Sequence, residues 1–283
     1  MSERISNEDE KYGILKEFVK NNTSLPLIEE NLLKNFLHCC DHNVESAKIL
    51  IVNSYKLRSS YPQIFIDRDP DSIEIKQQLE SEAMVLFPEK TNNGDQVTLY
   101  KLMNGDPSKF RFTMALKIFI MFFDVRCIIP GATGNHEITI FDMDGCSLKH
   151  VKSANITAIR ALFKYLQEAI TVKLKEIHLL NCPVFIDKIM AILKPFIRND
   201  LYKKIRFHQP NSLTIYDYVP KELFPIEYGG NSYHLEDIRT EWVNKLKDNR
   251  EYLINSENWK YRSNSSLFAN PLSDGTFNPL NFD

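Results

Sequence analysis

Strand-like and helix-like segments alternate through the middle of the chain, and this alternation constrains the fold more than any other feature. Strands are favoured by short apolar, β-branched runs, and helices by apolar residues that recur every three to four positions. The strand-like segments are residues 97–102, 137–141, 176–180 and 205–208, and the helical segments between them are 112–125, 156–170 and 183–197. Repeated strand–helix units make successive strands parallel, because each helix carries the chain back across the sheet. We therefore predict an α/β fold with a mainly parallel sheet.

The residues on either side of this alternation have different patterns. Apolar residues recur at helical spacing over residues 6–58, and an irregular stretch with one short helix near 73–79 is expected before residue 90. A further helix is expected over 235–253. We place a small all-helical N-terminal module at 1–90, an α/β domain at 91–254, and at 255–283 a tail that we expect to lie extended on the surface.

Charge and cysteine content exclude several classes of protein. The 35 basic and 37 acidic residues give a net charge of −2, so no overall field attracts nucleic acid. Five cysteines, an odd number without a C-x-x-C pair, favour reduced thiols. The N-terminus lacks a secretory signal pattern, and the longest apolar run, residues 118–123, is far too short to span a membrane. We expect a cytoplasmic protein that associates with membranes only transiently.

Common catalytic and metal-binding motifs are absent from the sequence. With only 9 glycines it contains no dinucleotide or P-loop fingerprint, no G-x-S-x-G elbow and no H-E-x-x-H. His38 and His42 have the spacing of a zinc pair on a helix, but Asp41 indicates that the helix ends between them. Asp142 and Asp144 supply too few oxygen ligands for a cation loop. We therefore expect no enzyme activity, no catalytic residues, no metal and no cofactor.

Two helical segments are unusually apolar. Residues 112–125 are apolar around nearly the whole helix, so they need cover on every side, and residues 184–197 have a broad apolar face. Packing in the core explains one such helix as well as an apolar ligand does, whereas two favour a ligand. Pro195 either loosens the last turn of the second helix, which a movable lid would use, or marks the end of that helix.

Basic residues concentrate around the second apolar helix. Residues 171–208 contain eight basic and three acidic side chains, a local charge of +5, which leaves −7 for the rest of the chain. An apolar helix flanked by lysines is typical of a surface that docks on anionic lipid. The alternative is a basic face that is merely solvated.

Three segments of the sequence resemble signatures of the CRAL-TRIO (Sec14-like) family of intracellular lipid-transfer proteins, especially its tocopherol-transfer and retinaldehyde-binding branch. They are IFDMDG at 140–145, KEIHLLNCPVFIDKIMAILKPFI at 175–197 and LFPIEYGGN at 223–231. Residues 35–65 are similar to the helical module that precedes the lipid domain in that family, and GTFNPLNFD at 275–283 is similar to the tail of some animal members. The resemblance covers essentially residues 25–283.

The resemblance implies a non-enzymatic carrier that encloses one hydrophobic ligand beneath a lid helix at 184–197 and exchanges it at membranes. The ligand would be tocopherol-like, retinoid-like or a related lipid. The alternative is an interaction module that senses lipid without transferring it. By resemblance, the pocket walls would be Leu116, Phe119, Phe123, Phe141, Leu162, Tyr165, Leu166, Ile170, Leu174, Ile177, Leu179, Ile186, Ile189, Met190 and Leu193.

The tocopherol carriers of this family also use a basic cleft that engages phosphoinositide headgroups. The residues that would contact phosphoinositides or other anionic lipids here are Lys173, Lys175, Arg198, Lys203 and Lys204. The sequence departs from the family pattern at Asp200, which stands at one basic position. It also has Phe119 and Phe123 where the tocopherol branch has small hydroxyl side chains, and Cys146 at a tryptophan position. The implied partners are the hydrophobic ligand and an anionic membrane surface, with no nucleic acid, and the ligand need not be tocopherol.

Overall fold

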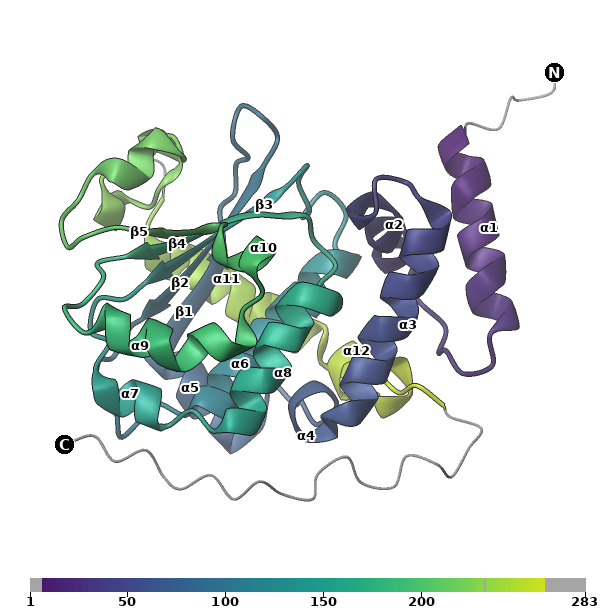
Figure 1. Cartoon of the computed structure of the whole chain (residues 1–283), viewed down its shortest axis with the longest axis horizontal. Helices are drawn as coiled ribbons and strands as arrows, with labels where there is room; N and C mark the ends of the chain where they lie inside the picture. Colours follow the sequence, from purple (N-terminus) through teal and green to yellow (C-terminus); the bar gives the residue numbers. More distant parts are fainter. Residues whose placement is uncertain (1–6, 232, 263–283) are drawn as a thin grey trace.

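The computed structural model describes residues 7–231 and 233–262, and it begins with a helical region (Figure 1). The helices before the sheet are α1 (Asn7–Asn21), α2 (Glu30–Cys39), α3 (Val44–Ser60), α4 (Pro62–Phe65) and α5 (Ile73–Ser81). The side chain of Asn43 starts α3 by accepting a hydrogen bond from the backbone N–H of Ser46 at 2.9 Å. Ala47, Ile51 and Tyr55 recur at a spacing of four residues and bury one face of α3 against α1 and α2. These helices therefore have an apolar core of their own.

A five-stranded sheet follows the helical region. Its strands are β1 (Glu82–Leu86), β2 (Gln96–Leu102), β3 (Glu137–Asp142), β4 (Leu174–Leu180) and β5 (Ile205–Phe207), and they lie in the order β1-β2-β3-β4-β5. β1 is antiparallel to β2, and the other neighbours are parallel. The connecting helices are α6 (Phe112–Ile128), α7 (Leu148–Lys152), α8 (Ile156–Glu168), α9 (Ile186–Leu193) and α10 (Asn199–Tyr202). The prediction of a mainly parallel α/β fold after a helical N-terminal region is confirmed.

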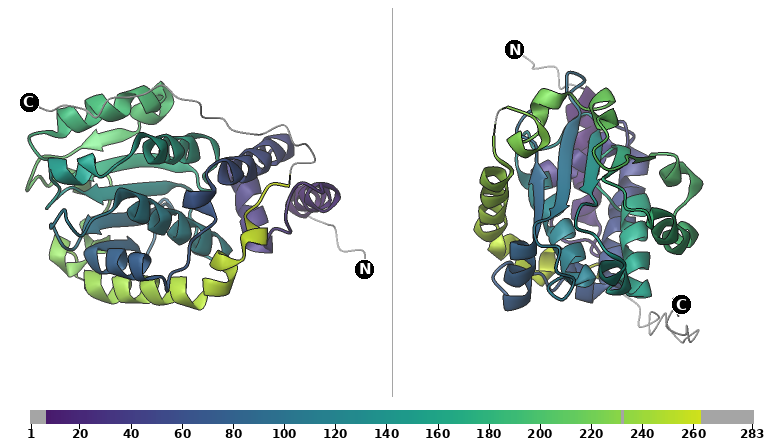
Figure 2. Two further views of the ribbon diagram at one scale, coloured as in Figure 1. Left: turned by 90° about the horizontal axis from the view of Figure 1, so that it is seen from below. Right: turned by 90° about the vertical axis from the view of Figure 1, so that its left-hand side faces the viewer.

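The two faces of the sheet are covered by different segments. Tyr100, Phe141 and Leu179 are neighbours across β2, β3 and β4, and Phe119 of α6 stacks on Phe141 with 6.4 Å between ring centroids. The opposite face is covered by a segment in which Tyr218 packs on His178, with 4.8 Å between ring centroids. That segment contains the 3₁₀ turns η2 (Thr214–Asp217), η3 (Lys221–Leu223) and η4 (Ile226–Tyr228). Helix α11 (Leu235–Asp248) runs along β1, whereas α9 lies toward β5, as the two views of Figure 2 show.

The structure corrects the prediction at two places and decides between two alternatives at a third. Residues 82–86, expected to be irregular, form β1; both of its faces are buried, so its sequence lacks the alternation that signals a strand. In the tail, only 255–262 lie within the described residues, and these are not extended on the surface, because η5 (Ser256–Asn258) brings Trp259 into the core. Residues 263–283 lie outside the described residues.

Helix α9 ends at Leu193, and Pro195 lies in the 3₁₀ turn η1 (Lys194–Phe196), so this proline marks the end of the helix. The division of the chain at residues 90 and 254 stays a prediction.

A buried ion cluster joins the helical region to the rest of the molecule. Asp124 of α6 accepts hydrogen bonds from Arg58 of α3 at 2.9 and 2.6 Å, and a further one from Arg68. The indole of Trp259 lies against both guanidinium groups, 4.9 Å from that of Arg58 and 4.3 Å from that of Arg68. Residues more than 200 positions apart thus share one interior site.

Candidate ligand-binding site

The residues predicted to line the pocket gather on one face of the sheet. They come from α6, β3, α8, β4 and α9, except Ile170, which lies between α8 and β4, and each is buried or half-buried. Phe141 and Leu166 each pack in two apolar clusters, one in the main core and a smaller one around Ile177. Phe119 and Phe123, both from α6, contact each other with 4.8 Å between their ring centroids.

Helix α9 is attached to this face by apolar contacts alone. Ile189 and Met190 are 6% and 9% exposed, whereas Val184 just before the helix is fully exposed. Across the described residues, no ion pair or side-chain hydrogen bond ties Ile186–Leu193 to another element. The middle of α9 is therefore held only by packing.

Polar contacts hold the chain at both ends of α9. Before the helix, the Asn181 side chain donates to Asp142 at 2.8 Å. After it, Gln167 of α8 donates to the carbonyl of Phe196 at 3.1 Å and accepts from the backbone N–H of Arg198 at 2.7 Å. A segment with fixed ends and an apolar middle is suited to lift without losing its position.

The predicted basic residues largely have partners within the protein. Lys173 pairs with Asp41, and Lys175 pairs with the buried Asp95 at 2.6 Å. Lys204 donates to the carbonyl of Leu174, which places it beside those two lysines, and Lys203 is exposed. Arg198 lies apart from them, bonded to the carbonyl of Gln167 on α8 at 2.6 Å.

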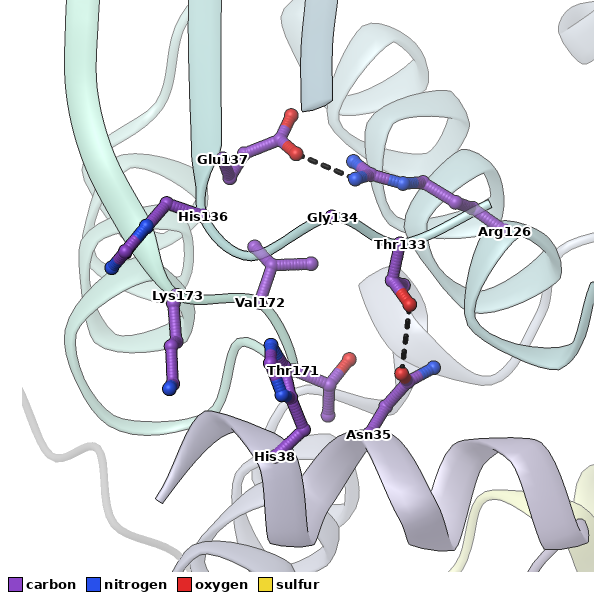
Figure 3. A pocket seen from close by; sticks show the side chains of 10 residues that line it. All are labelled: Asn35, His38, Arg126, Thr133, Gly134, His136, Glu137, Thr171, Val172 and Lys173. Carbon is purple, nitrogen blue, oxygen red and sulfur yellow. Dashed lines mark hydrogen bonds and ion pairs between the residues drawn. The ribbon is translucent and has the colours of Figure 1, made fainter. Parts of the chain in front are cut away.

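A pocket opens beside Lys173, where α2 meets the amino ends of β3 and β4 (Figure 3). The Arg126–Glu137 ion pair, with 2.6 Å between its closest atoms, lies across it from His38. Its lining is Asn35, His38, Arg126, Thr133, Gly134, His136, Glu137, Thr171, Val172 and Lys173. Sequence analysis missed His136 and Asn35 here, because only the packing of α2 against the loop before β3 brings them to Lys173.

The residues considered for metal binding are arranged for other purposes. Helix α2 ends at Cys39, and Asp41 and His42 have positive φ angles of 51° and 58°, so the two histidines do not share a helix face. Asp142 accepts hydrogen bonds from Lys101 at 2.8 Å and Tyr228 at 2.6 Å; burial opposes its ionisation, but these bonds hold the pKa of Asp142 below its usual value. The described part of the chain contains no group of three or more side chains placed to hold a metal ion.

A second pocket lies between α5, β1, α6 and α11. It is lined mainly by apolar residues, among them Met84, Ile118 and Trp242, and by the carboxyl group of Glu82. One oxygen of Glu82 accepts hydrogen bonds from Gln78 at 2.6 Å and from the hydroxyl of Tyr100 at 3.1 Å, and burial raises the pKa of Glu82 to about 7. The sequence did not indicate that the carboxyl group of Glu82 is buried, because the strand on which it lies, β1, was not predicted.

Comparisons with known proteins place this fold among lipid-binding proteins. A family model described as "CRAL/TRIO domain" matches residues 80–230, and one described as "Pinta-like, UBA domain" matches 5–75. Alpha-tocopherol transfer protein-like from Homo sapiens is 23% identical over 223 residues, which cover 79% of this chain and 64% of that protein. Clavesin-1 from Rattus norvegicus is 22% identical over 202 residues, 71% of this chain and 57% of that protein. The chain thus spans less than two thirds of the length of these curated relatives.

The same fold is found among solved structures. One described as "Crystal structure of Sfh5" superposes with a TM-score of 0.54 at 12% identity, and it covers 87% of this chain and 97% of that chain. Among the helices of the described residues, none is both long enough and apolar enough to cross a membrane.

Proposed function

The chain belongs to the CRAL-TRIO family, and on this premise we propose that it binds one small hydrophobic ligand between the sheet and helices α6, α8 and α9, without catalysing a reaction. The observation that carries the proposal is the attachment of α9, which is fixed at both ends and held only by apolar contacts in between. The fifteen predicted wall residues, four of which lie on α9 itself, supply the apolar lining. Burying apolar ligand surface there contributes about 25 cal/mol per Å², enough to hold a ligand tightly without a covalent bond.

Release of the ligand then takes place at a membrane. When α9 lifts, Ile189 and Met190 lose their cover, and in water this exposure is unfavourable. Against a bilayer the same side chains exchange protein contacts for lipid contacts. We therefore propose a lipid-transfer protein that acts in the cytoplasm and touches anionic membranes through Lys173, Lys175, Arg198, Lys203 and Lys204.

The ligand class follows from the lining. Phe119 stacks on Phe141 and contacts Phe123, so a ligand that lies against Phe141 must either be slender or displace the ring of Phe119. A tocopherol-like, retinoid-like or related lipid is our proposal.

Solvent extraction of the full chain, purified without detergent, followed by mass spectrometry tests binding. We expect one predominant apolar compound in near-stoichiometric amount. If nothing is extracted, and the protein also fails to take up retinoids, tocopherols and phospholipids from vesicles, the proposal is wrong.

A transfer assay separates the carrier from a lipid sensor. A carrier accelerates movement of a fluorescent lipid from donor to acceptor vesicles in proportion to protein concentration. A sensor binds the lipid and leaves the transfer rate unchanged.

A further inference from the structure

The ion cluster of Arg58, Arg68 and Asp124 carries a surplus positive charge. The three residues are only 4%, 1% and 1% exposed, and two guanidinium groups share one carboxylate. Within residues 7–231 and 233–262, no second acidic side chain pairs with either arginine. Burial lowers the pKa of Arg68, as expected for a charge that is incompletely offset. The aromatic face of Trp259 offsets part of this charge but accepts no conventional hydrogen bond.

Hydrogen-bond donors in the same region lack acceptors. Nε and Nη2 of Arg68 and the hydroxyl of Tyr165 are buried and have no hydrogen-bond partner. Buried donors are nearly always paired in folded proteins, because leaving one unpaired is costly. A missing acceptor is therefore indicated, and the surplus charge indicates that it is an anion.

Tyr165 connects this cluster to the proposed ligand site. Its ring centroid lies 6.4 Å from that of Phe119, a predicted pocket wall, and 6.0 Å from the guanidinium of Arg58. On the side of the N-terminal helices it packs on Phe65, with 5.7 Å between ring centroids. Tyr165 is thus the one predicted wall residue with a hydroxyl, its ring lies against the Arg58 guanidinium, and the hydroxyl is buried.

We infer that the ligand carries a carboxylate at one end, which accepts a hydrogen bond from Tyr165 and balances the surplus charge of Arg58 and Arg68. This inference rests on the proposed function, since the apolar part of the ligand occupies the proposed site. A carboxylate fits because it brings a single negative charge and two acceptor oxygens, which match one unit of surplus charge and donors on two residues. A buried water molecule would satisfy the donors but leave the charge uncompensated.

Two probes of equal chain length test the inference, dodecanoate and dodecanol, titrated at neutral pH into the full chain after its lipids have been removed. For the unmodified protein we expect dodecanoate to bind at least about tenfold more tightly than dodecanol. Arg68→Met removes the surplus charge. It should bring the ratio of the dissociation constants for dodecanol and dodecanoate close to one, because only the binding of dodecanoate is weakened. Tyr165→Phe should lower the ratio severalfold. Lys164→Met, which removes an exposed positive charge next to Tyr165 on α8, is the matched control and should keep the original ratio.

The outcomes separate the inference from the proposed function. Equal binding of the two probes to the unmodified protein overturns the carboxylate and leaves an apolar ligand site. Binding of neither probe overturns both. A ratio that Tyr165→Phe leaves unchanged also overturns the inference, and this variant decides the matter if circular dichroism shows that Arg68→Met does not fold.

Discussion

Glu82 lies at the start of β1, where the fold places a carboxyl group among apolar side chains. One of its oxygens is paired with Gln78 and Tyr100, and the other has no hydrogen-bond partner. The unpaired oxygen disfavours the ionised form, so burial raises the pKa of Glu82 from 4.5 to about 7. The stability of the fold therefore depends on whether Glu82 is protonated.

Stability should depend on pH through Glu82. Because its pKa is higher in the folded than in the unfolded chain, its contribution is fully present below about pH 4.5 and is lost as the pH rises through about 7. We expect Glu82→Gln to remove this decline and to raise the free energy of unfolding at about pH 8 by about 3 kcal/mol. Urea unfolding at several pH values measures it. Glu80→Gln on the exposed face of α5 should keep the original profile; if Glu82→Gln gives the same profile as the unmodified protein, the assignment is wrong.

For individual residues, the sequence predicted the positions of apolar side chains but not the partners of the buried charged ones. The positions of Phe119 and Phe141 follow from helical and strand periodicity combined with the family resemblance. The partners of Asp124 do not, because Arg58 and Arg68 are 66 and 56 residues away and no local pattern links them. Only the folded chain brings these charges together, from α3, from the segment between α4 and α5, and from α6.

Helices α6 and α9 are both apolar, but the structure accounts for them differently. Helix α6 is covered by α2, α4, α5, α8, α11 and β1, so its all-round apolar surface is largely explained by core packing. The two charged residues that interrupt its apolar surface also have partners inside the fold. Lys117 donates a hydrogen bond to the carbonyl of Asp67 at 2.5 Å, and Asp124 forms ion pairs with Arg58 and Arg68. Among the described residues, by contrast, Asp187, Lys188 and Ala191 on the outer side of α9 are exposed. The sequence predicted both helices, and it also distinguished them, because residues 112–125 are apolar on all sides and residues 184–197 have one broad apolar face.

Local opening of α9 should be separable from global unfolding. Ile189→Ala removes about 1–3 kcal/mol of packing, so amide hydrogen exchange across 186–193 should become roughly 10- to 100-fold faster. The midpoint of global unfolding should move little, because α9 makes few other contacts. Ala191→Met, on the exposed side of the same helix, should leave exchange unchanged. Faster exchange spread equally over α8 and the sheet would contradict an independently moving α9.

Across the whole molecule, the uneven charge of the sequence is partly neutralised by the fold. Asp41, from the turn after α2, reaches Lys173, and Asp95, just before β2, reaches Lys175. The electrostatic potential around residues 171–208 is therefore less positive than their net charge of +5 indicates. This pairing depends on contacts between distant segments, and the sequence alone did not predict it.

Membrane attachment should nevertheless depend on these lysines. Reversing Lys173, Lys175, Lys203 and Lys204 to Glu should abolish cosedimentation with anionic vesicles at low salt, since each basic side chain near the headgroups contributes about 1 kcal/mol. The matched control reverses four exposed lysines elsewhere, Lys16, Lys20, Lys109 and Lys247, and should retain most of the binding. Equal loss in both variants would mean that net charge alone governs attachment.

Residues 259–262 pack against the first helices of the sequence, and this has a consequence for synthesis on the ribosome. Arg58 leaves the ribosome early, but Trp259, which lies against it, is made 201 residues later. At about 10 residues per second this delay is roughly 20 s. Tyr261 and Arg262 then donate backbone hydrogen bonds to Ser59 at 2.7 Å and to the carbonyl of Ser24 at 2.8 Å. Until residues 259–262 have been made, the first helices of the nascent chain therefore expose to water the charged and partly apolar surface that these residues later cover.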